Sequence, residues 1–284
     1  MLVLWGVEGA APYIFPISGL FYHGENERNL AKSDYGKYNE YVNAYVEDLR
    51  EKMNQDFPFY YVQLSSHIKD KWNGVPEQRA VQFDGLSVIK NSGIVVSMDH
   101  GVRPANGDTD ISHPNYKKPI GERLADLALC RLYGIGDENY VTSPMPEYAY
   151  KTDEGVVIKF KNVGDGLKRI GQHEKLSGFK IDLGENKRNV ETEIISKDEV
   201  LLKASRVVDQ VKSVAYGIDN LAFVDYPEGN GDLKYVANLG NSSDLPAPAF
   251  KISTLKEKPA EVTPTPEATE APTVTAEPDA TADP

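Results

Sequence analysis

The chain has 284 residues, of which 40% are hydrophobic and 26% are charged. This balance is typical of a globular protein with enough apolar residues for two small domains. The 43 Asp and Glu residues outnumber the 31 Lys and Arg residues and give a net charge of −12, which argues against nucleic-acid binding. No apolar run approaches the ~18 residues of a membrane span. The single cysteine, Cys130, excludes a disulfide framework and a multi-cysteine zinc site.

Residues 1–136 alternate between apolar strand-like runs and helical periodicity, which predicts a parallel sheet covered by helices. We expect strands at residues 17–22, 59–64 and 94–98, and helices at residues 38–53, 75–90 and 120–132. Ser33 or Asp34 is the predicted N-cap of the first helix, and Gly134 is the predicted stop of the last. Residues 1–8 lack the basic start and cleavage site of a signal peptide, so we expect a short strand or an irregular lead-in there.

From about Tyr140 the chain changes to short strand-like runs separated by Gly, Asn, Asp and Pro, which predicts a small antiparallel β-sandwich. The expected strands are residues 156–160, 179–183, 199–203, 211–216 and 235–237. The last 26 residues hold six acids, six prolines and no Lys or Arg, which is typical of a disordered linker. The expected division is an α/β domain at 1–136, a β-sandwich at 137–254 and a disordered linker at 255–284.

Three polar segments follow the three predicted parallel strands, at the edge where open α/β sheets bind ligands. They are residues 23–26, 65–67 and 99–113. The third segment contains Asp110 and His113. An Asp three residues before a His can orient the imidazole, whose other nitrogen then acts as a general base toward a serine hydroxyl. The alternative is a loop histidine that caps the following helix.

The same loop offers a metal site as a second alternative, because carboxylates and imidazoles bind hard and borderline cations. Its five potential ligands are Asp99, His100, Asp108, Asp110 and His113. No paired-histidine motif accompanies them on a helix. We therefore expect neither a metal ion nor a cofactor.

Longer motifs occur in a fixed order along the chain. Those of the first half are Leu20-Phe-Tyr-His-Gly-Glu-Asn-Glu27, Asp56-Phe-Pro-Phe-Tyr-Tyr-Val-Gln-Leu64, Asp110-Ile-Ser-His-Pro-Asn-Tyr-Lys117, Gly121-Glu-Arg-Leu-Ala125 and Tyr133-Gly134. Those of the second half are Leu176-Ser-Gly-Phe-Lys-Ile181, Val214-Ala-Tyr-Gly217, Ala237-Asn-Leu-Gly-Asn241 and Leu245-Pro-Ala-Pro-Ala-Phe250. Together they resemble the sialate O-acetylesterases, SGNH-type serine hydrolases that remove acetyl groups from sugars.

The resemblance runs from about residue 14 to 253 and implies both a fold and a set of roles. The fold is an SGNH (flavodoxin-like) parallel sheet with flanking helices, followed by a small antiparallel β-sandwich. His113 would be the general base and Asp110 its partner. The Gly24 backbone N–H and Asn26 would stabilise the oxyanion, with His23 and Glu25 beside them as substrate-binding residues. His23 departs from the family pattern, which has Gln at this position.

The nucleophilic serine of that family lies in a Gly-x-Ser-like block well before the Gly-Glu-Asn segment. Only 22 residues precede His23, and their one serine, Ser18, falls inside a predicted strand. We therefore expect an incomplete α/β domain, the C-terminal part of such a hydrolase, with the nucleophile unidentified. Ser65 and Ser66, before His67, are the substitutes that the chain offers. A chain of this kind would be marginally stable or prone to associate.

The expected substrate is an acetylated carbohydrate, either sialic acid or another sugar, and the expected protein partner is a complementing N-terminal segment or a second copy. Family and tail imply a location outside the cell or at its surface. The alternative function is a non-catalytic carbohydrate-binding or structural module. Binding of acetylated glycans without release of acetate would favour that alternative.

Overall fold

The computed structural model describes residues 2–5, 18–65, 74–100, 117–171, 174–219 and 237–258, and only the backbone of residues 2–5, 31 and 32. The predicted linker from residue 259 onward lies outside these ranges. None of the helices within them is long and apolar enough to cross a membrane.

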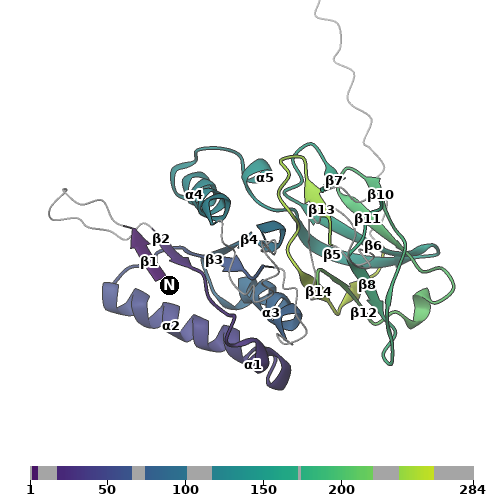
Figure 1. Ribbon diagram of the computed structural model, residues 1–284, viewed down its shortest axis with the longest axis horizontal. Coiled ribbons are helices and arrows are strands. Elements are labelled where there is room, and N and C mark those ends of the chain that lie inside the picture. Colours follow the sequence, from purple (N-terminus) through teal and green to yellow (C-terminus); the bar gives the residue numbers. More distant parts are fainter. Residues whose placement is uncertain are drawn as a thin grey trace, which may run out of the picture.

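The first half of the chain forms a four-stranded sheet flanked by helices (Figure 1). Its strands, in spatial order, are β1 (Leu2–Trp5), β2 (Ser18–Phe21), β3 (Phe59–Gln63) and β4 (Ser92–Val96). β2, β3 and β4 are parallel, as predicted, and β1 pairs antiparallel with β2. The helices are α1 (Arg28–Ser33), α2 (Lys37–Met53), α3 (Val75–Val88) and α4 (Lys118–Tyr133). The short strand β1 confirms one of the two expectations for residues 1–8.

Both faces of the sheet are covered by helices. Successive residues of a strand point to opposite sides, so alternate side chains of the parallel strands pack on each face. One face packs against α2 and α3 through a cluster that includes Phe59, Tyr61, Ile94, Val42, Val46 and Val81. The other face packs against α4 through Tyr60, Val62, Val95, Ile120, Leu124 and Leu127. Figure 1 shows α4 on one side of the sheet and α2 on the other, which makes three layers.

The ends of the helices confirm one prediction and correct another. α4 ends at Gly134, whose φ of 66° is the left-handed conformation that glycine favours. The N-cap of α2 is Gly36, with a φ of 100°, so the prediction of Ser33 or Asp34 was wrong. An additional helix, α1, occupies this segment, and Asp34 lies at its C-terminal end.

The second half of the chain is built of short strands. After the short helix α5 (Glu138–Val141), the strands are β5 (Met145–Thr152), β6 (Gly155–Lys161), β7 (Leu167–Arg169), β8 (Phe179–Asp182), β9 (Lys187–Asn189), β10 (Thr192–Ser196), β11 (Glu199–Lys203), β12 (Ser213–Tyr216), β13 (Leu239–Asn241), β14 (Phe250–Ile252) and β15 (Leu255–Lys256). Their spatial orders are β10-β11-β6-β5-β15, β14-β12-β8-β9 and β13-β7. These strands pair antiparallel except for β15, which pairs parallel with β5, and this agrees with the predicted fold class. Of the strand predicted at residues 235–237, only Ala237 lies within the described residues. Ala237 is not in a strand, because β13 begins two residues later.

The two halves share contacts that are buried on both sides. The Gln63 amide at the end of β3 donates to the Ala249 carbonyl at 2.8 Å and accepts from the Ala249 N–H at 2.8 Å. Phe83 of α3 lies 5.9 Å from Phe250, centroid to centroid. Val96 of β4 belongs to the hydrophobic cluster of the β-sheets. The boundary at residues 136 and 137 stays a prediction.

Candidate functional site

The carboxyl end of β2 is held by side chains from two helices. The His23 carbonyl oxygen accepts hydrogen bonds from the Tyr38 hydroxyl of α2 at 3.1 Å and from the Gln82 amide of α3 at 2.9 Å. The Gln82 side-chain oxygen also accepts from the Leu64 N–H at 2.9 Å. Gln82 thereby ties the end of β2 to the end of β3.

The residue at this corner must be glycine for two reasons. Gly24 has a φ of 132°, which side-chain-bearing residues rarely adopt. A Cβ at this position would lie 3.0 Å from Gln82 Nε2 and 3.2 Å from Gln78 Nε2. Both the backbone and the surrounding amides therefore exclude a larger residue.

The anchored His23 carbonyl fixes the direction of the next N–H. In a trans peptide the C=O and N–H point in opposite directions. The Gly24 N–H therefore points away from Tyr38 and Gln82, and no residue that the structure describes accepts a hydrogen bond from it. A fixed N–H without an acceptor at the end of a parallel strand can bind a carbonyl oxygen or an oxyanion.

The other three predicted residues of this segment, His23, Glu25 and Asn26, differ in their contacts. His23 Nε2 lies 3.5 Å from Glu27 Oε2, and the imidazole stacks on the Tyr38 ring at 6.2 Å between centroids. The Glu25 carbonyl accepts from the Arg28 guanidinium at 2.7 Å. Asn26 is exposed, and its side chain has no hydrogen bond to the described part of the chain. The side chain of Asn26 is therefore available to a ligand.

Three hydroxyl groups meet at the ends of the three parallel strands. The Tyr22 hydroxyl, just after β2, lies 3.4 Å from Ser97 Oγ, and Tyr22 also hydrogen-bonds the Ser65 side chain. Burial raises the pKa of Tyr22 to about 12, so the phenol is neutral at pH 7. Ser97 donates to the Gln63 carbonyl at 2.7 Å, so its hydroxyl proton is already engaged.

The segment after β4 begins with an ion pair that involves Asp99, one of the potential ligands of the alternative metal site. The Arg123 guanidinium of α4 donates to both carboxylate oxygens of Asp99, and to the Val96 carbonyl at 2.6 Å. This bidentate pair occupies the Asp99 oxygens. Burial lowers the pKa of the neighbouring His100. No group of three or more metal-binding side chains occurs among the residues that the structure describes.

Several predicted residues lie outside the described residues: Asp108, Asp110, His113, Ser66 and His67. Their roles stay predictions. Ser18 is the first residue of β2, at the opposite end from Gly24, and it is 4% exposed. Its position agrees with the expectation that Ser18 is no nucleophile.

Sequence reasoning missed the polar residues of α3 that support this edge. Gln78, Arg79 and Gln82 are all buried. Arg79 donates to the Ser65 carbonyl at 3.0 Å and to the Gly217 carbonyl at 3.0 and 3.2 Å. The feature that could have revealed them is a helix whose buried side carries amides and a guanidinium. Such groups are rarely buried unless they hydrogen-bond to a partner such as the backbone.

No protein-family model matches the chain, and no curated protein matches it. Among solved structures, the chain is similar to XAC1771, described as a novel carbohydrate acetylesterase from Xanthomonas citri, with 23% identity and a TM-score of 0.65. The match covers 83% of this chain and 50% of that protein, so the chain spans half the length of the structure it matches. The fold is therefore like that of a carbohydrate acetylesterase.

Proposed function

We propose that this chain forms part of a carbohydrate acetylesterase, with its substrate bound at the carboxyl ends of β2, β3 and β4. The observation that carries the proposal is the Gly24 N–H, which is fixed by the anchored His23 carbonyl and has no acceptor in the described structure. The fold supports it, because the similar solved structure is a carbohydrate acetylesterase. The substrate is an O-acetylated sugar, sialic acid or another.

The proposed reaction is acyl transfer through a serine. The serine oxygen attacks the acetyl carbonyl carbon while His113, oriented by Asp110, takes the hydroxyl proton. The carbonyl oxygen becomes an oxyanion, stabilised by the Gly24 N–H and the Asn26 amide, and each such donor contributes about 3–4 kcal/mol. The sugar oxygen then leaves with the proton from His113. Water, activated by the same imidazole, attacks the acetyl-enzyme and releases acetate.

The nucleophile is proposed to come from a complementing N-terminal segment that carries a Gly-x-Ser motif. Within the described residues, Ser65 is a serine whose side chain contacts the Tyr22 hydroxyl at this edge. The proposed location is outside the cell or at its surface, on the strength of the family resemblance and the acidic, proline-rich tail.

The test is acetate release from p-nitrophenyl acetate and from an O-acetylated oligosaccharide. If a serine of this chain serves, release is measurable and is lost in His113→Ala. Gly24→Ala keeps the N–H but displaces it, because alanine rarely adopts a φ of 132° and its Cβ would press on Gln82 and Gln78, so release is expected to fall, by up to the ~100-fold typical for the loss of one oxyanion donor. Gly36→Ala is the matched control, because Gly36 also has a positive φ but has no atom within 4 Å of its Cβ position.

If the nucleophile comes from a complementing segment, the chain alone is inactive and co-expression with the upstream coding sequence restores release. Absence of release under both conditions, together with absence of binding to the O-acetylated oligosaccharide, would overturn the proposal. Binding without release under both conditions would assign the chain to the non-catalytic carbohydrate-binding modules.

A further inference from the structure

The amino ends of β3 and β4 border a groove with a volume of about 640 Å³. Gly24 follows the carboxyl end of β2, so the groove lies at the opposite end of the parallel strands from the candidate site. Its walls come from the segments before β3 and β4, from the ends of α3 and α4, and from α5. Pockets that hold small molecules have volumes of about 300–1,000 Å³. The groove is therefore large enough for a sugar ring.

Two guanidinium groups hold the walls of the groove in place. Arg50, which is 7% exposed, donates at 2.8 and 3.0 Å to one carbonyl in each of the segments that precede β3 and β4. Arg131 of α4 donates to the Ser92 carbonyl at 2.9 Å and to the Glu138 carboxylate of α5 at 2.6 Å. Groups that are fixed before a ligand arrives lose little conformational freedom when it binds. The groove is therefore preorganised.

A buried phenol borders the groove without a hydrogen-bond partner. Tyr60 is 1% exposed, and its hydroxyl makes no hydrogen bond with any residue that the structure describes. Its ring lies beside the Arg131 side chain, since a Cβ at Gly93 would be 3.0 Å from Tyr60 Cδ1 and 2.7 Å from Arg131 Nη1. Burial raises the pKa of Tyr60, and the charges of Arg131 and Glu138 also act on it, so the hydroxyl lies near their ion pair. Buried phenols usually have a hydrogen-bond partner, and a ligand in the groove can supply it.

The charges that line the groove cancel. Asp56 and Glu138 are balanced by Lys90 and Arg131. One oxygen of Glu138 accepts both bonds from Arg131, and within the described ranges neither the other oxygen nor the Lys90 ammonium group has a partner. The C-terminal ends of α3 and α4 add partial negative charge, which disfavours an anion, while the two basic side chains disfavour a cation. Hydroxyl groups both donate and accept, so a neutral polyol matches this mixture of acceptors and donors.

We propose that this groove binds a neutral sugar unit of an oligosaccharide, at a site separate from the one for the acetyl ester. The Tyr60 hydroxyl and the second oxygen of Glu138 hydrogen-bond sugar hydroxyls, and Lys90 and Asn91 contact the sugar from the rim. The apolar C–H face of the sugar packs on Leu132. The inference goes beyond the proposed function and does not depend on it, because no acetyl group takes part in the binding.

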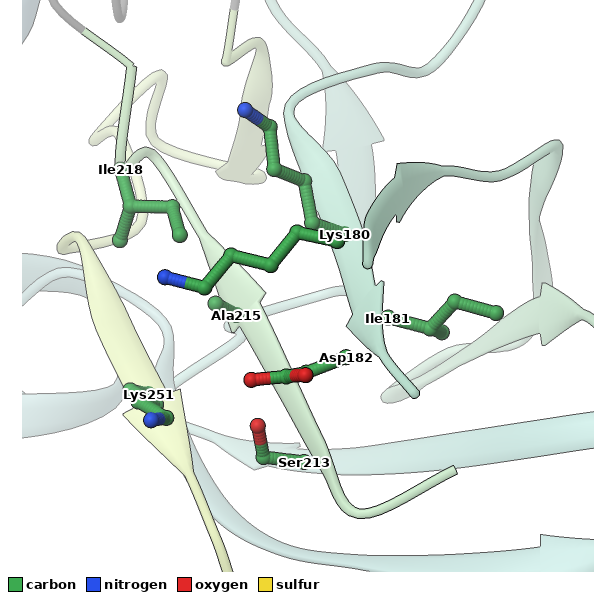
Figure 2. Close-up of a pocket in the computed structure, with 8 residues that line it drawn as sticks. Lys180, Ile181, Asp182, Ser213, Ala215, Ile218 and Lys251 are labelled. Atoms are coloured by element: carbon green, nitrogen blue, oxygen red, sulfur yellow. The ribbon is translucent and has the colours of Figure 1, made fainter. Parts of the chain in front are cut away.

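The depression on the outer face of the β14-β12-β8-β9 sheet offers no comparable space. Its volume is about 10 Å³, and Ser213 in its floor is 4% exposed. Figure 2 shows the Asp182 and Ser213 side chains pointing toward one another, and Lys180 pairs with Asp219. The polar groups of this depression thus face each other rather than a ligand. Lys251 at its border is an exposed lysine outside the groove and provides a control.

The test titrates the full chain with xylotetraose, cellotetraose and mannotetraose, all without acetyl groups, and follows ¹H–¹⁵N spectra. The Asn91 and Ser92 amides, at the groove, are expected to shift with at least one of these sugars, and the Gly24 amide is expected to stay in place. Tyr60→Phe removes a hydroxyl that holds nothing in the described structure. It is therefore expected to weaken sugar binding about fivefold, the effect of one neutral hydrogen bond, and to leave the urea midpoint unchanged.

Tyr61→Phe is the matched control on the same strand. The Tyr61 hydroxyl donates to the Gln82 carbonyl at 2.9 Å, so its loss is expected to lower the urea midpoint and to leave the sugar affinity unchanged. Lys90→Gln is expected to weaken binding about threefold, the effect of one exposed charge contact, and Lys251→Gln is expected to have no effect.

Asn91 and Ser92 amides that shift with none of the three sugars, or a Tyr60→Phe protein that binds sugar as tightly as the wild type, would overturn the proposal. Tetragalacturonate or spermine that binds more tightly than the neutral sugars at the same amides would overturn it too, in favour of a charged ligand. Because none of the sugars carries an ester, the outcome is independent of whether the chain releases acetate.

Discussion

Replacing Arg79 with methionine removes a buried cation that joins the two halves of the molecule. Arg79 is 0% exposed and donates to three backbone carbonyls, those of Ser65, Gly217 and Asp219. Ser65 follows β3, whereas Gly217 and Asp219 follow β12. Methionine fills a similar volume without a donor, so the variant isolates the loss of these hydrogen bonds.

The expected magnitude follows from two opposing terms. Each carbonyl left without a donor in the interior costs about 1–3 kcal/mol, so three cost about 6 kcal/mol. Burial lowers the pKa of Arg79 to about 10, and the shift corresponds to about 3 kcal/mol of burial cost that the variant relieves. The net loss is about 3 kcal/mol, which lowers Tm by about 6–12 °C for a domain of this size.

The assay is urea unfolding followed by circular dichroism and by tyrosine fluorescence. Arg79→Met is expected to shift the midpoint, and Arg206→Met, at an exposed position, is expected to stay within about 0.5 kcal/mol of the wild type. Arg79→Lys keeps the charge but cannot reach three carbonyls, so it is expected to be at least as destabilising. An Arg79→Met protein as stable as the wild type would refute the reasoning.

Three further predictions concern single side chains. Tyr216→Phe leaves the buried Leu239 N–H without its 2.7 Å acceptor and is expected to cost about 1–2 kcal/mol in urea unfolding, and no measurable loss would contradict this. Arg123→Ala leaves the Asp99 carboxylate, 12% exposed, without its bidentate partner and is expected to cost about 3 kcal/mol, with Arg123→Lys recovering part of it. Burial lowers the pKa of His100 below 6.5, so the unfolded chain binds more protons between the two values and the free energy of unfolding falls as the pH falls through that window. His100→Gln is expected to flatten this fall at pH values around and below 6.5, and an unchanged slope would exclude His100 as its source.

The parallel strands of the first half were predictable because they are buried on both faces. Phe59–Gln63 is apolar at four of five positions and fully buried, and the run is bounded by Pro58. The stop of α4 at Gly134 was predictable from glycine's access to positive φ. Where the hydrophobic pattern and the local backbone preferences agree, both the element and its end can be predicted from the sequence.

Strands on the surface of the second half were not predictable in this way. All three residues of β9 (Lys187–Asn189) are exposed, so no hydrophobic pattern marks the strand. β9 forms because its backbone pairs with β8, which is a tertiary effect. The N-cap of α2 was missed for a similar reason, because an unpredicted helix, α1, uses the polar residues that precede it.

The supporting residues of the candidate site were hidden by a different cause. Gln82 and Arg79 look like ordinary polar residues of a surface helix, yet they are buried against backbone carbonyls from distant strands. Their partners, at His23 and Gly217, lie 59 and 138 residues away. Gly24 itself was predictable from the local Gly-Glu-Asn motif, whereas the anchoring of its peptide required the fold.

The most direct test of the account is the amide resonance of Gly24 in ¹H–¹⁵N spectra. The protein is titrated with an O-acetylated oligosaccharide and, separately, with the same oligosaccharide after chemical removal of the acetyl groups. We expect the Gly24 amide to shift with the acetylated sugar and to stay in place with the deacetylated one, whatever the source of the nucleophile. A Gly24 chemical shift that changes with neither sugar, or changes equally with both, would contradict the proposal that this N–H binds the acetyl ester.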